Sequence, residues 1–338
     1  MKRLLTAALG GLLALGLAAC GTSAAPENAG AEPVSVVLGW YPTAESGGFY
    51  AAEEQGLYAQ QGLDVDIRPG GPQVSQTQVV ASGRADFGLS DATTVANAKA
   101  TGIPIVAVAA LFQENPVGVM VHADSGAQDW KDLAGRTWYV QTGQLGQEWV
   151  KRSQGIDFTT AAYNGSIATF VHDDAAVQQG WPTNEAYTAQ KEGVQTRFLS
   201  YASAGYNPYN DVIFTTEDFL RDNPEKVRSF LDATMRGWSA YMSDTALAEK
   251  VNATLQQENP QLDAAANWFA WDAQRQFLTA GDGAAALGSM SAERWSTLVD
   301  QMTQLGALKP GLDPASLFDT SALPTVPAPA SLPPAPAA

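Results

Sequence analysis

Residues 38–67 read LGWYPTAESGGFYAAEEQGLYAQQGLDVDI, and this stretch decides the predicted fold. A short apolar strand ends at Trp40 and Tyr41, the segment 49–61 has the pattern of a helix, and 63–67 alternates with the period of a strand. A strand, a helix and a second strand in this order predict a parallel βαβ unit. The two aromatic residues where the first strand stops are explained either by core packing or by a pocket that stacks a flat ligand.

The same alternation continues along the chain. Apolar strands are predicted over 85–89 and 103–111 with a helix between them, and a second unit of alternating elements begins near Ala123. The region from 217 to 308 has mainly helical patterns. The sequence therefore predicts an α/β protein in which helices cover parallel sheets.

The first twenty residues have the features of a secretory signal peptide. Lys2 and Arg3 precede the apolar run LLTAALGGLLALGLAA, which is too short for a membrane-spanning helix with proper flanks. The run leads into Leu-Ala-Ala-Cys, which resembles a bacterial lipobox, so we expect Cys20 to carry lipid and to anchor the protein outside the cytoplasmic membrane. The alternative is an ordinary signal peptide with an accidental cysteine. Residues 21–33 are small and polar, as in a flexible tether.

Composition excludes several classes of site and partner. Cys20 is the only cysteine, so neither an internal disulfide nor a thiolate metal cluster can form. The formal net charge of −16 argues against nucleic acid and against electrostatic capture of an anionic membrane. The stretch 324–338, PTVPAPASLPPAPAA, is predicted to be a disordered tail or linker because it has no means of forming a core.

Polar and aromatic side chains follow several predicted strands, at the edge where open α/β sheets bind ligands. The candidates are Trp40, Tyr41 and Glu45 after the first strand, Ser90 and Asp91 after the third, and Trp181 and Glu185 in the second unit. Indole and phenol rings offer flat faces for stacking, and carboxylates accept hydrogen bonds from ring amines. The geometry predicted is an aromatic sandwich closed by two lobes. The alternatives are a core position for Trp40 and helix caps for the carboxylates.

Catalytic motifs are sparse. His122 and His172 are the only histidines and lack HExxH spacing, and the chain has no G-x-S-x-G elbow, Walker loop or G-x-G-x-x-G turn. The pair Gly47-Gly48 is better explained as turn residues. We expect a protein that is not an enzyme and holds no cofactor or metal, with a His/Asp/Ser triad and an oxygen-ligated metal site left open as alternatives.

The order of motifs resembles the periplasmic solute-binding proteins of ABC importers. The resemblance covers roughly residues 34–323 and rests on LGWYP…GGFYAAEEQGLYAQQGLDVDI, VVASGRADFGLSDATTV, ATGIPIVAVAALFQENPVGVMV, WKDLAGRTWYV, QQGWPTNEA, NPEKVRSFLDATMRGW and ERWSTLVDQMTQLGAL. The most similar branch includes thiamine-pyrimidine-precursor, riboflavin, sulfonate and nitrate binders. The resemblance implies a type II fold with lobe one over 34–122 and 205–323, lobe two over 123–204, and a hinged ligand cleft.

Individual residues carry over from that branch. Trp40-Tyr41-Pro42 matches a Trp-Phe-Pro-Asn-type turn, except that Thr43 stands where the branch has an amide side chain. GWPTNE matches a Trp-Asn-x-Glu-type segment, which assigns ligand contacts to Trp181 and Glu185.

The remaining expected ligand contacts come from two other segments. Asn115 lies in the stretch QENP, and Gln141 and Thr142 lie in a loop that leads to a helix N-terminus. Backbone amides at such a terminus suit an anionic or carbonyl group.

Charge favours a neutral or cationic ligand. The segments placed at the cleft carry Glu45, Asp91 and Glu185 but no lysine or arginine, whereas sulfonate and nitrate binders need cationic or amide-rich cages. The expected ligand is a small planar N-heterocycle such as an aminopyrimidine. Sulfonate, nitrate and riboflavin are the alternatives.

The resemblance also implies partners. A monomeric binding protein would deliver its ligand to an ABC permease and ATPase, and a non-transport sensor with the same lobes is the alternative. Fungal pyrimidine-precursor synthases share the fold but consume their own histidine and use iron with a cysteine-rich motif. This chain lacks that motif.

Overall fold

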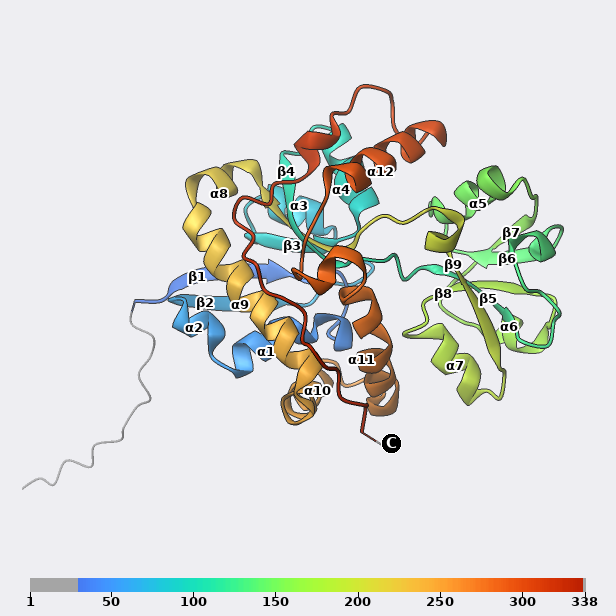
Figure 1. The fold of residues 1–338 in the computed structure, drawn as a ribbon, viewed down its shortest axis with the longest axis horizontal. Helices are drawn as coiled ribbons and strands as arrows, with labels where there is room; N and C mark the ends of the chain where they lie inside the picture. The colour runs from blue at the N-terminus through green and yellow to red at the C-terminus, as the bar shows by residue number, and fades with distance from the viewer. Residues whose placement is uncertain (1–29, 337–338) are drawn as a thin grey trace, which may run out of the picture. The chain divides into compact units, whose positions relative to one another are not determined.

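A computed structural model describes residues 30–336 of the chain, coloured from blue to red in Figure 1. The predicted signal peptide, the predicted lipid attachment at Cys20 and the predicted tether up to residue 29 lie outside the described residues. Within the described range, the chain contains no helix that combines the length and apolarity needed to cross a membrane.

The first sheet is mixed and has five strands in the order β2-β1-β3-β10-β4. Its strands are β1 (Glu32–Val37), β2 (Leu63–Arg68), β3 (Phe87–Ser90), β4 (Ile105–Phe112) and β10 (Asn210–Thr216). The predicted βαβ unit is present, because β1 and β2 pair in parallel. β10 runs antiparallel to both β3 and β4, with Val212 opposite Ser90 and Ala110. The beginning of β10 therefore lies at the carboxyl ends of its two neighbours.

The second sheet has five strands in the order β7-β6-β8-β5-β9. Its strands are β5 (Gly118–His122), β6 (Thr137–Val140), β7 (Thr159–Ala162), β8 (Val177–Gly180) and β9 (Thr196–Ser200). β5 pairs antiparallel with β8 and β9, so it belongs to this sheet and not to the lobe predicted over 34–122. The difference has a physical reason: β5 is buried and apolar over most of its length, and such a strand fits either core equally well.

Helices cover both sheets (Figure 1). The α-helices are α1 (Gly47–Glu54), α2 (Leu57–Gln60), α3 (Gln76–Ala81), α4 (Ala92–Ala100), α5 (Gly146–Gln154), α6 (Ala168–His172), α7 (Glu185–Lys191), α8 (Glu217–Asp222), α9 (Pro224–Ser243), α10 (Thr245–Glu258), α11 (Ala264–Leu278) and α12 (Ala292–Gln304). Short 3-10 turns are η1 (Ala44–Ser46), η2 (Trp130–Leu133), η3 (Tyr201–Ala204), η4 (Gly281–Ala284) and η5 (Pro314–Leu317). The single helix predicted over 49–61 is divided at Gly56, whose φ of 63° breaks the helical path.

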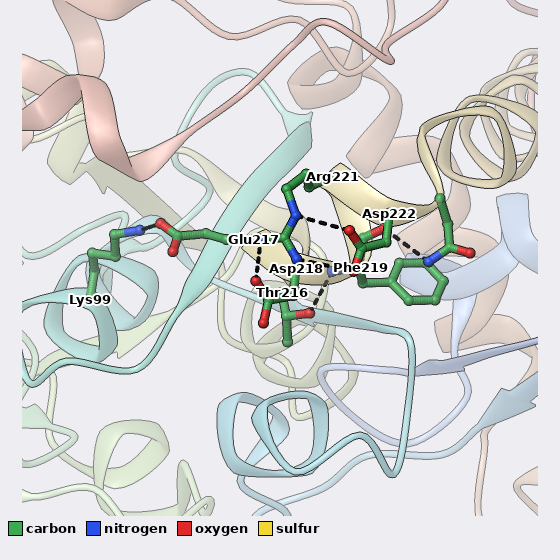
Figure 2. Close-up of polar contacts among 8 residues, drawn as sticks. Lys99, Thr216, Glu217, Asp218, Phe219, Arg221 and Asp222 are labelled. Atoms are coloured by element: carbon green, nitrogen blue, oxygen red, sulfur yellow. Dashed lines mark hydrogen bonds and ion pairs between the residues drawn. The ribbon is translucent and has the colours of Figure 1, made fainter.

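Figure 2 shows how β10 turns into α8. Thr216 caps the helix, because its Oγ1 accepts a hydrogen bond of 3.0 Å from the backbone N–H of Phe219. Lys99 of α4 forms an ion pair with Glu217, and Arg221 pairs with two carboxylates of its own helix. The two Arg221 pairs are largely exposed and contribute little to stability, whereas the Lys99 side chain is only 13% exposed in its pair with Glu217.

The pair Gly47-Gly48 is not a turn, contrary to the sequence-based prediction. The two glycines begin α1, and a Cβ at Gly48 would lie 2.2 Å from the indole of Trp238 on α9. From the other side of this contact, a Cβ at Gly237 of α9 would lie 2.3 Å from the backbone carbonyl oxygen of Gly48. Glycine is needed here so that α1 and α9 can approach closely.

The segment 324–336, which composition predicts to be disordered, lies in the structure against the hydrophobic core between the first sheet and its helices, here called the first core. The carbonyl of Val326 accepts a hydrogen bond of 2.8 Å from the backbone N–H of Leu287, and the Pro333 carbonyl accepts one of 2.6 Å from Arg275 Nη1. The side chains of Val326 and Ala335 pack on core residues. A Pro/Ala segment cannot build a core of its own, but its carbonyls and methyl groups complete one that other elements supply.

We predict that Gly48→Ala destabilises the protein by about 1–3 kcal/mol, because the added methyl group overpacks the contact between α1 and Trp238. Urea denaturation measures the change. Gly39→Ala is the matched control, because its nearest neighbour would lie at an ordinary 3.6 Å. Equal stability of the two variants would contradict the close packing of α1 on α9.

Candidate functional site

The turn after β1 presents Glu45. Thr43 caps η1: its Oγ1 accepts a hydrogen bond of 3.3 Å from the Glu45 backbone N–H, and its own N–H donates to Ser46 Oγ at 3.3 Å. The Thr43 hydroxyl, which stands where the related branch has an amide, is thus part of a capping box. The turn directs the Glu45 carboxylate toward the loop after β8.

One hydrogen bond connects Glu45 with the second sheet's loops, and two more hold Glu185 beside it within those loops. Thr183 Oγ1 donates to Glu45 Oε1 at 3.1 Å. Two residues further on, Glu185 Oε2 accepts from the Trp181 backbone N–H at 2.7 Å, and Glu185 Oε1 accepts from the Tyr163 hydroxyl at 2.9 Å. The predicted segments around Glu45 and around Trp181 are therefore brought together.

Burial makes these carboxyl groups weak acids. Desolvation raises the pKa of Glu45 from 4.5 to about 7; the Thr183 hydrogen bond opposes this rise, and the nearby charge of Glu185 adds to it. Burial also raises the pKa of Glu185, against the lowering effect of its bonds from Trp181 and Tyr163. Glu45 as a whole residue is partly exposed, although its carboxyl group is desolvated.

Asp211 belongs to the same acidic group and was missed by sequence reasoning. It is the second residue of β10 and lies at the carboxyl ends of β3 and β4. Its Oδ2 is buried without a hydrogen-bond partner, and burial, together with the charges of Glu45 and Asp91, holds its pKa well above the ordinary value. Its φ of 47° makes it the only non-glycine residue at positive φ between residues 30 and 336. The available signal was an Asn-Asp pair before an apolar strand, because these residues tolerate that backbone conformation.

The aromatic candidates differ in exposure. Trp40 is 50% exposed and Tyr41 48%, and their rings meet edge to face at 5.4 Å. Trp181 is partly buried and packs against Phe112 with ring centroids 6.4 Å apart. Each indole thus has its own aromatic neighbour. The predicted sandwich between Trp40 and Trp181 stays a prediction.

Asp91 and Asn115 are occupied by contacts within the protein. Asp91 caps α4, since its carboxylate accepts bonds of 2.9 and 2.8 Å from the backbone N–H and hydroxyl of Thr94. The backbone N–H of Asn115 donates to Asn207 Oδ1 at 2.8 Å, and the Asn115 side chain is 3% exposed. Asn115 therefore ties together the two segments that cross between the sheets. Ser90 pairs with Val212 and is partly exposed.

Gln141 and Thr142 lie exposed at the end of β6. The Gln141 backbone N–H donates to Gln179 Oε1 of β8 at 2.8 Å, which holds the loop beside the end of that strand. A cavity of about 400 Å³ lies in the second unit beside Glu185. Its lining includes Tyr163, His172 and Glu185.

The two histidines lie on the second unit. His122 Nε2 is 2.7 Å from the Phe170 carbonyl oxygen, and His172 ends α6. In the part of the chain that the structure describes, no three His, Cys, Asp or Glu side chains are grouped to hold a metal ion.

Comparison with known proteins identifies the family. The model described as NMT1/THI5 like matches residues 43–247, which is more than half of the chain. The chain belongs to the NMT1/THI5-like family. This NMT1/THI5-like chain is 27% identical over 245 residues to a 4-amino-5-hydroxymethyl-2-methylpyrimidine phosphate synthase of Saccharomyces cerevisiae, an alignment that covers 65% of the chain and 70% of the relative.

Two further comparisons concern binding proteins. The NMT1/THI5-like chain is 28% identical over 256 residues to the formylaminopyrimidine-binding protein of Halalkalibacterium halodurans, with 70% of the chain and 75% of the relative covered. The periplasmic aliphatic sulphonate-binding protein SsuA of Escherichia coli superposes with a TM-score of 0.66 at 15% identity, over 85% of this chain and 97% of SsuA. The predicted periplasmic binding protein fold is confirmed.

We predict that Glu45 makes stability depend on pH. Its folded pKa of about 7 exceeds the ordinary 4.5, so the folded state holds the proton more tightly and stability falls as pH rises between these values. Glu45→Gln should reduce the stability lost between pH 5 and pH 8 by on the order of 2 kcal/mol, as measured by urea denaturation. Glu249→Gln, exposed on α10, serves as the control and should retain the wild-type pH dependence. The hypothesis fails if Glu45→Gln behaves like the control.

Proposed function

We propose that this NMT1/THI5-like chain is an extracytoplasmic solute-binding protein that captures a small planar N-heterocycle of the aminopyrimidine type for an ABC importer. The observation that carries the proposal is the cluster of Glu45, Glu185 and Asp211, three carboxyl groups of raised pKa where the loops of both sheets meet. The proposal draws further support from the family, which includes a relative named for binding a formylaminopyrimidine.

The chemistry of the cluster suits a ligand rich in N–H donors. Glu45 is joined to the protein by the Thr183 bond, and Asp211 Oδ2 has no partner in the described structure. An amino group or a protonated ring nitrogen would satisfy these oxygens, and a charge-assisted hydrogen bond would stabilise the ionised carboxylates. The raised pKa values indicate that burial favours the protonated carboxyl groups, and a cationic donor would instead favour the ionised carboxylates.

The half-exposed rings of Trp40 and Tyr41 support the planar shape of the proposed ligand. Two large aromatic side chains without full cover offer faces on which a heterocycle can stack. Trp181 would approach the ligand from the loop that Glu185 holds by its bond to the Trp181 N–H. Replacing either indole should therefore weaken binding without unfolding the protein.

Capture would proceed by closure of the two sheets about the crossing segments. The bond between Thr183 and Glu45 joins a loop of the second sheet to a loop of the first, so it exists only when these loops are close. A ligand that contacts both loops has a higher affinity for the closed form and shifts the population toward it. The closed form is the state that we expect the permease to recognise.

The synthase activity of several relatives is the second candidate function, and it is favoured by their shared family. A binding role accounts better for this chain's residues. The fungal synthases that this chain resembles use iron with a cysteine-rich motif. This chain has a single cysteine, Cys20. Its His122 lies against the Phe170 carbonyl in the second unit. Lipid attachment at Cys20 would keep the protein at the membrane, beside its permease and ATPase. We expect the protein to act there as a monomer.

We predict that the wild-type protein binds 4-amino-5-hydroxymethyl-2-methylpyrimidine with micromolar or tighter affinity, about −8 kcal/mol. Isothermal titration calorimetry against taurine, nitrate and riboflavin provides the comparison. Trp40→Ala should weaken pyrimidine binding roughly tenfold because it removes the stacking face. Tight binding of taurine alone would overturn the assignment of a heterocycle.

We also predict that Asp211→Asn weakens pyrimidine binding roughly 10- to 100-fold, the usual loss for a hydrogen bond to a charged group. Asparagine tolerates the same backbone conformation, so the fold should be retained. Asp64→Asn, exposed on β2, changes the net charge equally and should bind as the wild type does. If both variants bind alike, Asp211 is not a ligand contact.

A further inference from the structure

Helix α11 contacts the turn that carries Glu45 through two buried amide side chains. Asn267 Oδ1 accepts a hydrogen bond of 2.7 Å from the backbone N–H of Ala44, and Gln274 Nε2 donates one of 2.8 Å to the Ala44 carbonyl. Both side chains are almost fully buried, at 2% and 0% exposure. The peptide groups on either side of Ala44, the residue before Glu45, are thereby fixed from α11.

The orientation of each amide is determined by the group it meets. An N–H at Ala44 requires the oxygen of Asn267, and a carbonyl requires the nitrogen of Gln274, so neither amide can be reversed. The opposite ends, Asn267 Nδ2 and Gln274 Oε1, are buried without partners. Leaving such atoms unpaired is costly, and apolar side chains would avoid the cost. The presence of the two amide side chains is explained if the position of the turn that carries Glu45 matters.

The same helix contacts the second unit through α7 (Figure 1). The ring of Phe269 on α11 lies 5.1 Å from that of Tyr187 on α7. Lys191 Nζ, at the end of α7, is 3.2 Å from Asp263 Oδ2, and Asp263 also caps α11 by accepting from the Ala266 N–H. Because α7 begins at Glu185, these contacts hold the Thr183–Glu185 loop near the turn.

We propose that α11 is a positioning helix for the ligand site, and this inference rests on the proposed function. Through Asn267 and Gln274 the helix sets the turn that carries Glu45, and through Phe269 and Asp263 it holds α7 against that turn. Closure of the second unit and placement of Glu45 are therefore linked through one rigid element. None of these four side chains needs to touch the ligand.

Gln274→Met tests the first half of the proposal, because methionine keeps the length of the side chain but cannot donate to the Ala44 carbonyl. We expect the Glu45 pKa, measured by NMR of the carboxyl carbon, to fall by roughly one unit as water reaches the loosened turn. Affinity for 4-amino-5-hydroxymethyl-2-methylpyrimidine should fall roughly tenfold. Gln276→Met, an exposed change on the same helix, should leave both quantities at wild-type values.

Tyr187→Leu tests the second half at a partly exposed position, where the substitution does not threaten folding. It should also lower the Glu45 pKa, although both amides remain on α11. Thermal unfolding verifies that each variant is folded. A Glu45 pKa unchanged in Tyr187→Leu and in folded Gln274→Met would overturn the positioning role. If the wild type binds no pyrimidine but the pKa shifts occur, the proposed ligand is wrong while the positioning role stands.

Discussion

The hydrogen bond from Thr183 to Glu45 is the interaction on which the candidate site depends. It joins a loop of the first sheet to a loop of the second. At this position burial already destabilises the ionised form of the Glu45 carboxyl group. A carboxyl group in such a place either keeps its proton or acquires a donor. The neighbouring Asp211 and Glu185 are under the same constraint. The site is therefore poised to accept hydrogen-bond donors, which distinguishes it from the cationic cage that an anion requires.

The surrounding fold explains how three carboxyl groups come to share one region. The antiparallel insertion of β10 between β3 and β4 places the start of one strand beside the ends of two others. The close contact of α1 with α9 at Gly48 and Gly237 places the turn before α1, which carries Glu45, relative to the sheet. Local packing far from any ligand thus decides where the acidic oxygens lie.

Much of the architecture could be predicted from the sequence, because alternating periods of two and 3.6 residues identify strands and helices directly. Glu45 and the Trp181–Glu185 segment could be found because they follow predicted strands. The sheet to which β5 belongs could not be predicted, since its side chains suit either core. Asp211 escaped notice because its role comes from backbone conformation and from charges distant in sequence. The amides of α11 depend on contacts more than two hundred residues apart.

The C-terminal segment has a consequence for the order in which the protein acquires its structure. The nearest carbonyl oxygen to the Arg275 guanidinium on α11 is that of Pro333, and the Leu287 N–H donates to the carbonyl of Val326. During synthesis, domains generally fold as their residues emerge from the ribosome. The contacts made by residues 326–333 therefore join the core of the first sheet only after the helices that they cover have been synthesised.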